Sequence, residues 1–126
     1  MFAGCGGLSL GLEQAGFECS FVNEINETFA ATHRYNHQLA EEQYFVGDIN
    51  KLLEVVDNYN EYITDLDLVC GGPPCQGFSM ANRQKVIDDP RNQLYKSFLL
   101  FLAHTRPKFF LMENVKGMAN TICFKI

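Results

Sequence analysis

Short apolar segments alternate with amphipathic ones along the whole sequence, and this alternation limits the folds that the chain can adopt. Apolar runs rich in β-branched or aromatic residues predict strands, and they occupy 21–24, 44–46, 66–70 and 109–112. Apolar residues spaced three or four apart predict helices, and they occupy 8–15, 28–35, 52–56 and 93–105. In the second of these helices we expect Phe29 and Ala30 to point inward. Alternating strands and helices are typical of a parallel sheet with helices on both faces, so we predict an α/β fold.

The composition fits one domain in an intracellular protein. With 126 residues and 47% hydrophobic content, the chain is large enough for one core. It has no run near the roughly 20 apolar residues of a membrane span, and no basic segment followed by an apolar one at its start, so no membrane partner is expected. A formal net charge of -5 opposes a generally basic surface. If DNA is the substrate, much of its binding surface is therefore expected elsewhere.

Cysteines and histidines do not form a recognisable metal site. The five cysteines are an odd set without a CxxC pair, which argues against a disulfide framework and against a thiolate zinc site. His33 and His37 lie four residues apart without a third ligand nearby, so we interpret them as part of a solvated helix face and expect no metal. Cys19 and Cys70 are interpreted as small core residues.

Residues suited to ligand binding fall at the ends of predicted strands. The turn Phe2-Ala3-Gly4-Cys5-Gly6-Gly7 opens the first helix, where backbone can approach a ligand closely and offer amide donors. A ligand-free turn is an equally good interpretation of this motif alone. Glu24, however, follows about 20 residues later at the end of the next strand, where a carboxylate can accept hydrogen bonds from ribose hydroxyls. Asp48 follows the strand at 44–46 and can receive an adenine amino group, so an adenosine-containing cofactor is favoured.

Cys75 differs from the other cysteines in its polar, glycine-bounded surroundings. It follows Pro73-Pro74, whose rings stiffen the loop after the strand at 66–70. Because the thiolate is the reactive form of cysteine, Cys75 is a candidate nucleophile. The nearby charges fit either phosphate contacts or ordinary loop charges, and they are Arg83, Lys85 and Arg91.

Glu113 follows four apolar residues at the end of the last predicted strand, next to Asn114. We expect its carboxylate to be partly desolvated there and suited to general acid catalysis. A helix-capping or salt-bridged glutamate is the alternative interpretation.

Taken in order, five motifs of the chain resemble the amino-terminal motif series of the cytosine-5 DNA methyltransferases. They are Phe2-Ala3-Gly4-Cys5-Gly6-Gly7, Asn23-Glu24, Gly47-Asp48-Ile49, Gly72-Pro73-Pro74-Cys75-Gln76-Gly77-Phe78-Ser79 and Glu113-Asn114-Val115. The Pro-Cys-Gln loop and the Glu-Asn-Val triplet are the most specific of these.

The resemblance implies an incomplete Rossmann-like methyltransferase fold that binds S-adenosylmethionine. It implies that Cys75 adds to carbon 6 of a flipped cytosine in double-stranded DNA, that Glu113 protonates ring nitrogen 3, and that Asn114 helps to hold the loop. The positions that it assigns to the cofactor pocket are Phe2, Ala3, Gly4, Gly7, Glu24, Ile25, Asp48, Ile49, Pro74 and Leu94.

Some family features are missing from these 126 residues. In the family an apolar strand precedes the Phe-Ala-Gly turn, whereas here Met1 stands directly before Phe2, so the first strand is expected to be nearly absent. An Arg-x-Arg element, a target-recognition region and a closing cofactor-binding segment are also missing. We therefore expect 1–126 to be a partial catalytic domain, which acts in a longer enzyme or together with a complementary carboxyl-terminal chain.

Three other functions stay open at this point. The chain could be a non-catalytic remnant that binds only cofactor or partner, or a transfer-RNA cytosine methyltransferase, although Gly77-Phe78-Ser79 is closer to the DNA enzymes. A nucleotide-binding oxidoreductase is less well supported. The turn lacks the third glycine of GxGxxG, and a dehydrogenase has no need of a Pro-Pro-Cys-Gln loop.

Overall fold

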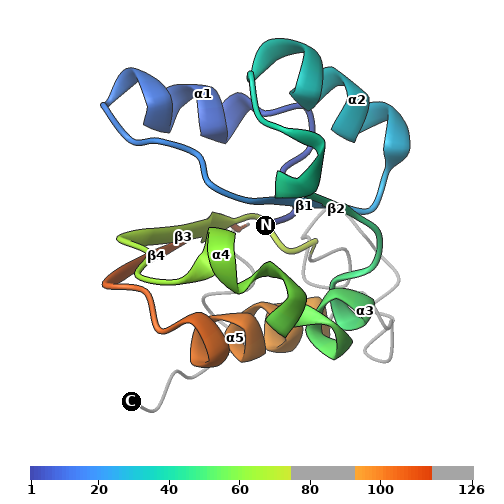
Figure 1. The fold of residues 1–126 in the computed structure, drawn as a ribbon, viewed down its shortest axis with the longest axis vertical. Helices are drawn as coiled ribbons and strands as arrows, with labels where there is room; N and C mark the ends of the chain where they lie inside the picture. The colour runs from blue at the N-terminus through green and yellow to red at the C-terminus, as the bar shows by residue number, and fades with distance from the viewer. Residues whose placement is uncertain (75–92, 115–126) are drawn as a thin grey trace, which may run out of the picture.

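A computed structural model describes residues 1–74 and 93–114, which form an alternating series of helices and strands (Figure 1). The elements are α1 (Gly7–Gln14), β1 (Val22–Glu24), α2 (Glu27–Asn36), η1 (Glu41–Gln43), β2 (Tyr44–Val46), α3 (Ile49–Glu54), η2 (Val56–Tyr59), α4 (Asn60–Ile63), β3 (Leu68–Gly71), α5 (Leu94–Thr105) and β4 (Phe109–Met112). Within these described ranges no helix is long and apolar enough to cross a membrane.

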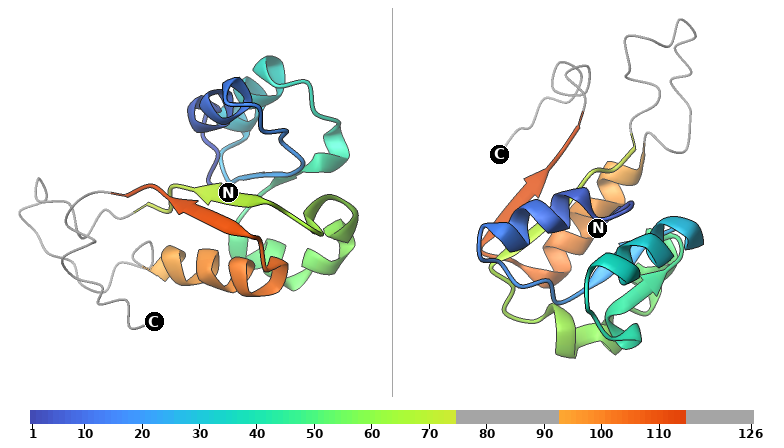
Figure 2. Two further views of the ribbon diagram at one scale, coloured as in Figure 1. Left: turned by 90° about the vertical axis from the view of Figure 1, so that its left-hand side faces the viewer. Right: turned by 90° about the horizontal axis from the view of Figure 1, so that it is seen from above.

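The strands form two parallel pairs. β1 pairs with β2, with Glu24 opposite Val46, and β3 pairs with β4, with Gly71 opposite Met112. α1 and α2 lie on one side of the strands, and α3 and α5 lie on the other (Figure 1 and Figure 2). The predicted α/β class, with parallel strands between two layers of helices, is therefore confirmed.

Residues 1–3 run between the two strand pairs and connect them. The Met1 nitrogen donates to the Cys70 carbonyl of β3 at 2.8 Å, and the Ala3 amide donates to the Asn23 carbonyl of β1 at 3.1 Å. The approach to β3 is so close that a Cβ added to Gly71 would lie 2.5 Å from the Met1 carbonyl oxygen. These few residues therefore join β3 to β1 by backbone hydrogen bonds on either side.

A cleft of about 800 Å³ lies beside this junction, at the opposite ends of the strands from the predicted site. Met1 and two segments, 15–21 and 61–70, line most of it. These segments lead into the amino ends of β1 and β3, whereas Glu24 and Asp48 follow the carboxyl ends of β1 and β2.

Helix boundaries follow local signals in the sequence. The Asn26 side chain caps α2 by accepting hydrogen bonds from the Thr28 and Phe29 amides at 2.9 and 3.1 Å. At the other end of the described chain, α5 stops at Arg106, which has a left-handed φ of 46° and precedes Pro107.

The main hydrophobic core lies between β3 and the helices α3 and α5. Phe98 and Phe101 of α5 are 0% and 1% exposed, and they pack with Leu52 of α3 and Val69 of β3. One polar contact crosses the same interface, because the Ser97 hydroxyl donates to the Asn50 side chain at 2.7 Å. The helix predicted at 93–105 is therefore confirmed, and its apolar residues Phe98 and Phe101 lie on the buried face.

Four details of the sequence analysis were wrong or imprecise. The helix predicted at 52–56 ends at Glu54 in α3, and Val56 begins η2. Ala30 is buried as expected, whereas Phe29 is 46% exposed. His33 and His37 do not form a solvated face, since both are buried against α1. Cys19 and Cys70 are only half-buried.

Replacing Phe98 by alanine should lower the free energy of unfolding by about 3–5 kcal/mol, because it leaves a cavity among fully buried neighbours. Leu100→Ala on the same helix is the matched control, since Leu100 is 60% exposed; its effect should stay within about 0.5 kcal/mol. Urea denaturation followed by circular dichroism measures both. Equal losses in the two variants would contradict this assignment of the core.

Candidate active site

Glu24 is the central polar residue of the site. It is 7% exposed, and each carboxylate oxygen accepts a backbone amide: Oε2 from Gly4 at 2.7 Å and Oε1 from Asn26 at 2.9 Å. Bonds from an ionised acceptor to amides are stronger than neutral ones, and they compensate for the burial of the charge. Glu24 thus fixes the glycine turn on one side and the start of α2 on the other, while each oxygen retains a second lone pair.

The glycine turn holds backbone conformations that side chains usually avoid. Phe2, Gly4 and Gly6 have φ angles of 53°, 57° and 94°. For Phe2 such an angle is unfavourable, and contacts with the surrounding structure must offset this cost in free energy. A Cβ added to Gly4 or Gly7 would meet no atom within 4 Å, so the surface there is open. At Gly6 the space is already filled by the rings of His33 and His37.

Asp48 has a structural task that explains its position without any ligand. It caps α3, with Oδ1 accepting from the Asn50 amide at 2.8 Å and from the Asn50 side chain at 3.0 Å. Its second oxygen has no hydrogen-bond partner among the described residues. Ile49 is 2% exposed and belongs to the core, so only its backbone can meet a ligand, whereas Ile25 is 68% exposed.

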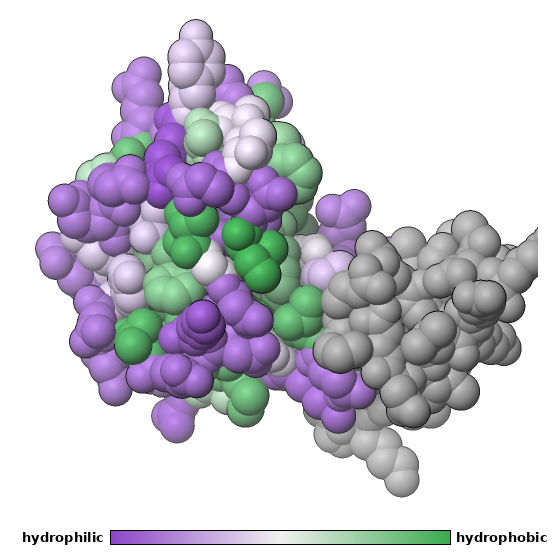
Figure 3. All heavy atoms as spheres, turned by 90° about the vertical axis from the view of Figure 1, so that its right-hand side faces the viewer, coloured by the Kyte–Doolittle hydropathy of each residue, from purple (hydrophilic) through white to green (hydrophobic). Residues whose placement is uncertain are grey.

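α2 and α3 begin directly after β1 and β2, on the right-hand side of Figure 1. Figure 3 views this side and shows hydrophobic residues exposed in its middle, between hydrophilic ones. The surface on this side of the molecule is therefore partly apolar.

Glu113 and Asn114 meet the segment that leads to Cys75. The Glu113 amide donates to the Gly71 carbonyl at 2.9 Å, and the Asn114 side chain donates to the Pro73 carbonyl at 2.9 Å. A Cβ on Gly72 would lie 3.9 Å from the Glu113 carboxylate. The end of β4 is therefore joined to the start of the proline loop, two residues before Cys75.

The expected partial desolvation of Glu113 is not found, because the residue is exposed. Pro74 and Leu94 are partly buried, and Leu94 packs against the core. Cys75 itself and the flanking charges Arg83, Lys85 and Arg91 lie outside the described residues. In 1–74 and 93–114, no group of three or more potential ligands could hold a metal ion.

Asn23 is an important residue of the site, although the sequence assigned it no role beyond its place in the Asn23-Glu24 motif. It is 2% exposed, and its side-chain amide donates to the carbonyls of Phe45 at 3.0 Å and Gly47 at 2.9 Å. These bonds join the end of β1 to the end of β2 and to the residue before Asp48. A polar residue within a short apolar strand was the available signal.

The fold and this site define an α/β protein with polar residues at the carboxyl ends of its parallel strands, and comparisons with known proteins identify the family. The model of the family described as "C-5 cytosine-specific DNA methylase" matches residues 1–123. The chain therefore belongs to this family, and the predicted resemblance is confirmed.

Individual relatives agree with this assignment. The chain is 43% identical over 118 residues to the type II methyltransferase M.NgoPII of Neisseria gonorrhoeae, an alignment that covers 94% of this chain and 33% of the relative. It is 37% identical over 122 residues to the type II methyltransferase M.AquIA of Picosynechococcus, with 95% and 48% covered. For the DNA (cytosine-5)-methyltransferase PliMCI of Paracentrotus lividus the identity is 39% over 132 residues, with 95% and 8% covered. The chain thus spans about a third of the length of M.NgoPII.

Replacing Glu24 by glutamine should lower the free energy of unfolding by about 1.5–3 kcal/mol, because glutamine keeps one acceptor oxygen and turns a donor toward the other backbone amide. Glu27→Gln is the control. Its side chain is 73% exposed, and among the residues that the structure describes its carboxylate contacts only Arg34, at 3.3 Å, so its effect should stay within about 0.5 kcal/mol. Urea denaturation at neutral pH measures both, and a Glu24 variant as stable as the control would refute the central role of this carboxylate.

Proposed function

We propose that this chain supplies the cofactor site, the nucleophile and the acid of an enzyme that methylates carbon 5 of cytosine in DNA. The observation that carries the proposal is the contact between the end of β4 and the proline loop. Through it, Glu113 and Asn114 lie beside Gly72 and Pro73, just before Cys75, in a chain that belongs to the cytosine-specific DNA methylase family.

The features of the glycine turn fit S-adenosylmethionine. Gly4 and Gly7 leave open space, Glu24 retains lone pairs for ribose hydroxyls, and Asp48 has an oxygen available for an adenine amino group. When bound, this cofactor supplies an electrophilic methyl group. The proposed pocket consists of Phe2, Ala3, Gly4, Gly7, Glu24, Ile25, Asp48, Ile49, Pro74 and Leu94.

The residues that follow β3 and β4 would activate the cytosine. The Cys75 thiolate adds to carbon 6 of the ring while Glu113 gives a proton to nitrogen 3, so that the electron pair of the 5,6 double bond becomes available at carbon 5. After methylation, loss of the proton on carbon 5 to a base expels the thiolate and restores the double bond, while nitrogen 3 returns its proton to Glu113. One nucleophile and one acid are sufficient for this activation.

Asn114 has a positioning role in this scheme. Its side chain holds the Pro73 carbonyl at 2.9 Å, and the two prolines restrict the backbone between this anchor and Cys75. The target base must also leave the DNA stack, at a cost of a few kcal/mol, which contacts with DNA outside this chain would offset.

We further propose that 1–126 is a partial catalytic domain that works with carboxyl-terminal sequence, either in one longer protein or in a complementary chain. The strand β4 has exposed large hydrophobic side chains, with Phe109, Phe110 and Leu111 at 71%, 58% and 44%. Such a patch is a typical contact surface for more polypeptide. The relatives contain enough additional chain to provide it.

Binding of S-adenosylmethionine should depend on Ile25 because this exposed side chain would pack against the cofactor. Ile25→Ser should weaken binding about tenfold, which corresponds to about 1.4 kcal/mol of lost apolar contact. Tyr35→Ser is the control, because Tyr35 is also exposed, at 90%, but lies on α2 outside the proposed pocket. Isothermal titration measures both, and NAD serves as the competing ligand. Binding of NAD without S-adenosylmethionine would favour an oxidoreductase and overturn the proposal.

Double-stranded DNA that contains 5-fluorocytosine should form a covalent adduct with Cys75 when S-adenosylmethionine and a carboxyl-terminal polypeptide built on a relative such as M.NgoPII are present. Cys75→Ser should abolish the adduct on a denaturing gel. Cys19→Ser should retain it, because burial raises the pKa of the Cys19 thiol and keeps it protonated.

The outcomes of this experiment separate the open functions. An adduct that persists in Cys75→Ser would refute the nucleophile. Absence of any adduct, together with tight cofactor binding, would mark a non-catalytic remnant. An adduct with transfer RNA but not with DNA would replace the substrate in the proposal.

A further inference from the structure

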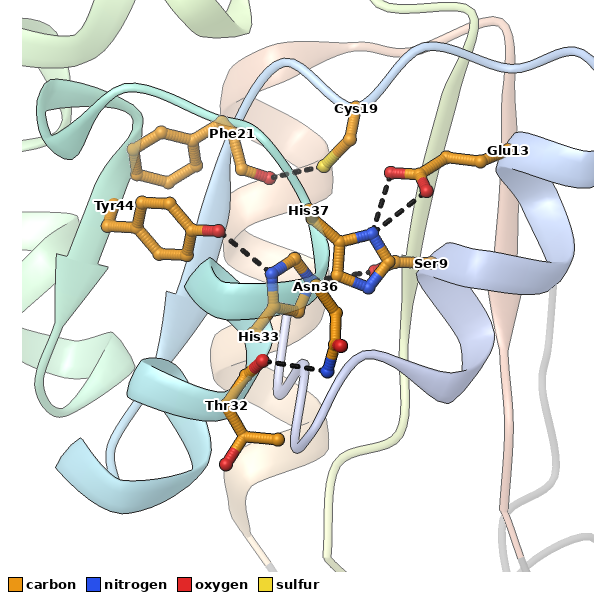
Figure 4. Close-up of polar contacts among 9 residues, drawn as sticks. All are labelled: Ser9, Glu13, Cys19, Phe21, Thr32, His33, Asn36, His37 and Tyr44. Atoms are coloured by element: carbon orange, nitrogen blue, oxygen red, sulfur yellow. Dashed lines mark hydrogen bonds and ion pairs between the residues drawn. The ribbon is translucent and has the colours of Figure 1, made fainter.

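A buried polar cluster joins α1 to α2 directly behind the glycine turn, and the proposed chemistry makes no use of it (Figure 4). At its centre are His33 and His37 of the α2 segment, which are 0% and 3% exposed. Their rings lie against each other, with centroids 4.1 Å apart and an angle of 32° between the planes. Two buried imidazoles at this place need a structural or functional reason.

His37 bonds to α1 through one side of its ring and contacts the turn with the other. Its Nδ1 lies 2.8 and 2.9 Å from the two carboxylate oxygens of Glu13. Because an ionised carboxylate only accepts hydrogen bonds, Nδ1 carries the hydrogen. The opposite edge of the ring lies against Gly6, where an added Cβ would be 2.4 Å from Nε2 and 2.9 Å from Cδ2.

His33 supports His37 from behind. Its Nδ1 lies 2.9 Å from the Tyr44 hydroxyl of β2, and its Nε2 lies 3.0 Å from the Ser9 hydroxyl of α1. Burial, followed by the neighbouring His37, lowers the pKa of His33 to about 4, so the ring is neutral at pH 7 and each nitrogen has a partner. His33 also reaches the turn, because its Cδ2 would lie 3.0 Å from a Cβ on Gly6.

Gly6 is the point at which the turn becomes a helix. It precedes α1 with φ 94°, its amide donates to the Ala3 carbonyl at 3.1 Å, and its carbonyl accepts from the Leu10 amide at 2.9 Å. Its missing side chain leaves the space that the two rings occupy. Glu24 holds the same turn from the other side through the Gly4 amide at 2.7 Å.

We propose that His33 and His37 are positioning residues that hold the glycine turn in the shape that receives the cofactor, with Glu13, Ser9 and Tyr44 as their anchors. The proposal rests on the proposed function, since it takes the turn as the binding site for S-adenosylmethionine. The rings contact Gly6 on its buried side, whereas Gly4 and Gly7 present open space. They therefore act through the turn and do not touch the cofactor.

Two variants of His37 separate its hydrogen bond from its ring contact. His37→Asn keeps an amide donor for Glu13 but removes the ring edge against Gly6, whereas His37→Ala removes both. His104→Asn is the control, because His104 lies near the end of α5 and meets only Asp57, at 3.5 Å, among the charged groups described.

Amide hydrogen exchange of Gly4 and Gly6, read by NMR, reports on the turn directly since both amides are hydrogen-bonded. In His37→Ala their exchange should become about tenfold faster, while amides within α5 stay within about twofold, as expected for local opening. His37→Asn should lie between this variant and the wild type. The dissociation constant for S-adenosylmethionine should rise in the same order, by about tenfold in His37→Ala.

Unchanged exchange of Gly4 and Gly6 in both variants would overturn the positioning role, and so would equal acceleration throughout α5. If His37→Ala does not fold, the exchange and affinity of His37→Asn decide. If the wild type does not bind S-adenosylmethionine at all, the proposed function fails, while the exchange data still test whether the histidines hold the turn.

Discussion

The buried carboxylate of Glu24 is the interaction on which this structure most depends. Its two oxygens accept amides from Gly4 and Asn26, and so one side chain joins the glycine turn, the end of β1 and the start of α2. The backbone extends the connection, because the Gly47 amide donates to the Glu24 carbonyl at 2.9 Å and brings in the segment before Asp48. Glu24 is only 7% exposed, and its charge is tolerated there because both carboxylate oxygens accept hydrogen bonds from fixed backbone amides.

The molecule divides into two halves that correspond to the two proposed tasks. The glycine turn and the β1–β2 pair carry most of the residues proposed for cofactor binding. The β3–β4 half carries those proposed for cytosine activation, together with Pro74 and Leu94 of the proposed cofactor pocket. Residues 1–3 bridge the halves through hydrogen bonds to Asn23 and Cys70. The absence of a side chain at Gly71 permits the close approach of Met1 to β3, because a Cβ there would lie 2.5 Å from the Met1 carbonyl oxygen.

Glycines of the turn are not equivalent, although they look alike in sequence. Gly4 and Gly7 face open space, and this is where a ligand can approach the backbone. Gly6 instead makes room for two imidazole rings from the α2 segment. The turn is consequently shaped by Glu24 on one side and by the histidines on the other, which gives an otherwise strained backbone around Phe2 a defined conformation.

Much of this protein followed from the sequence alone because the relevant signals are local. The period of apolar residues located the strands and helices within a few residues, and the motifs identified the family and placed Glu24, Asp48 and Glu113 at strand ends. Tertiary structure alone decided which face of α2 is buried, since that depends on the helix that packs against it. For this reason Phe29 is exposed, whereas His33 and His37 are buried: each outcome depends on neighbours distant in sequence, which no local pattern encodes.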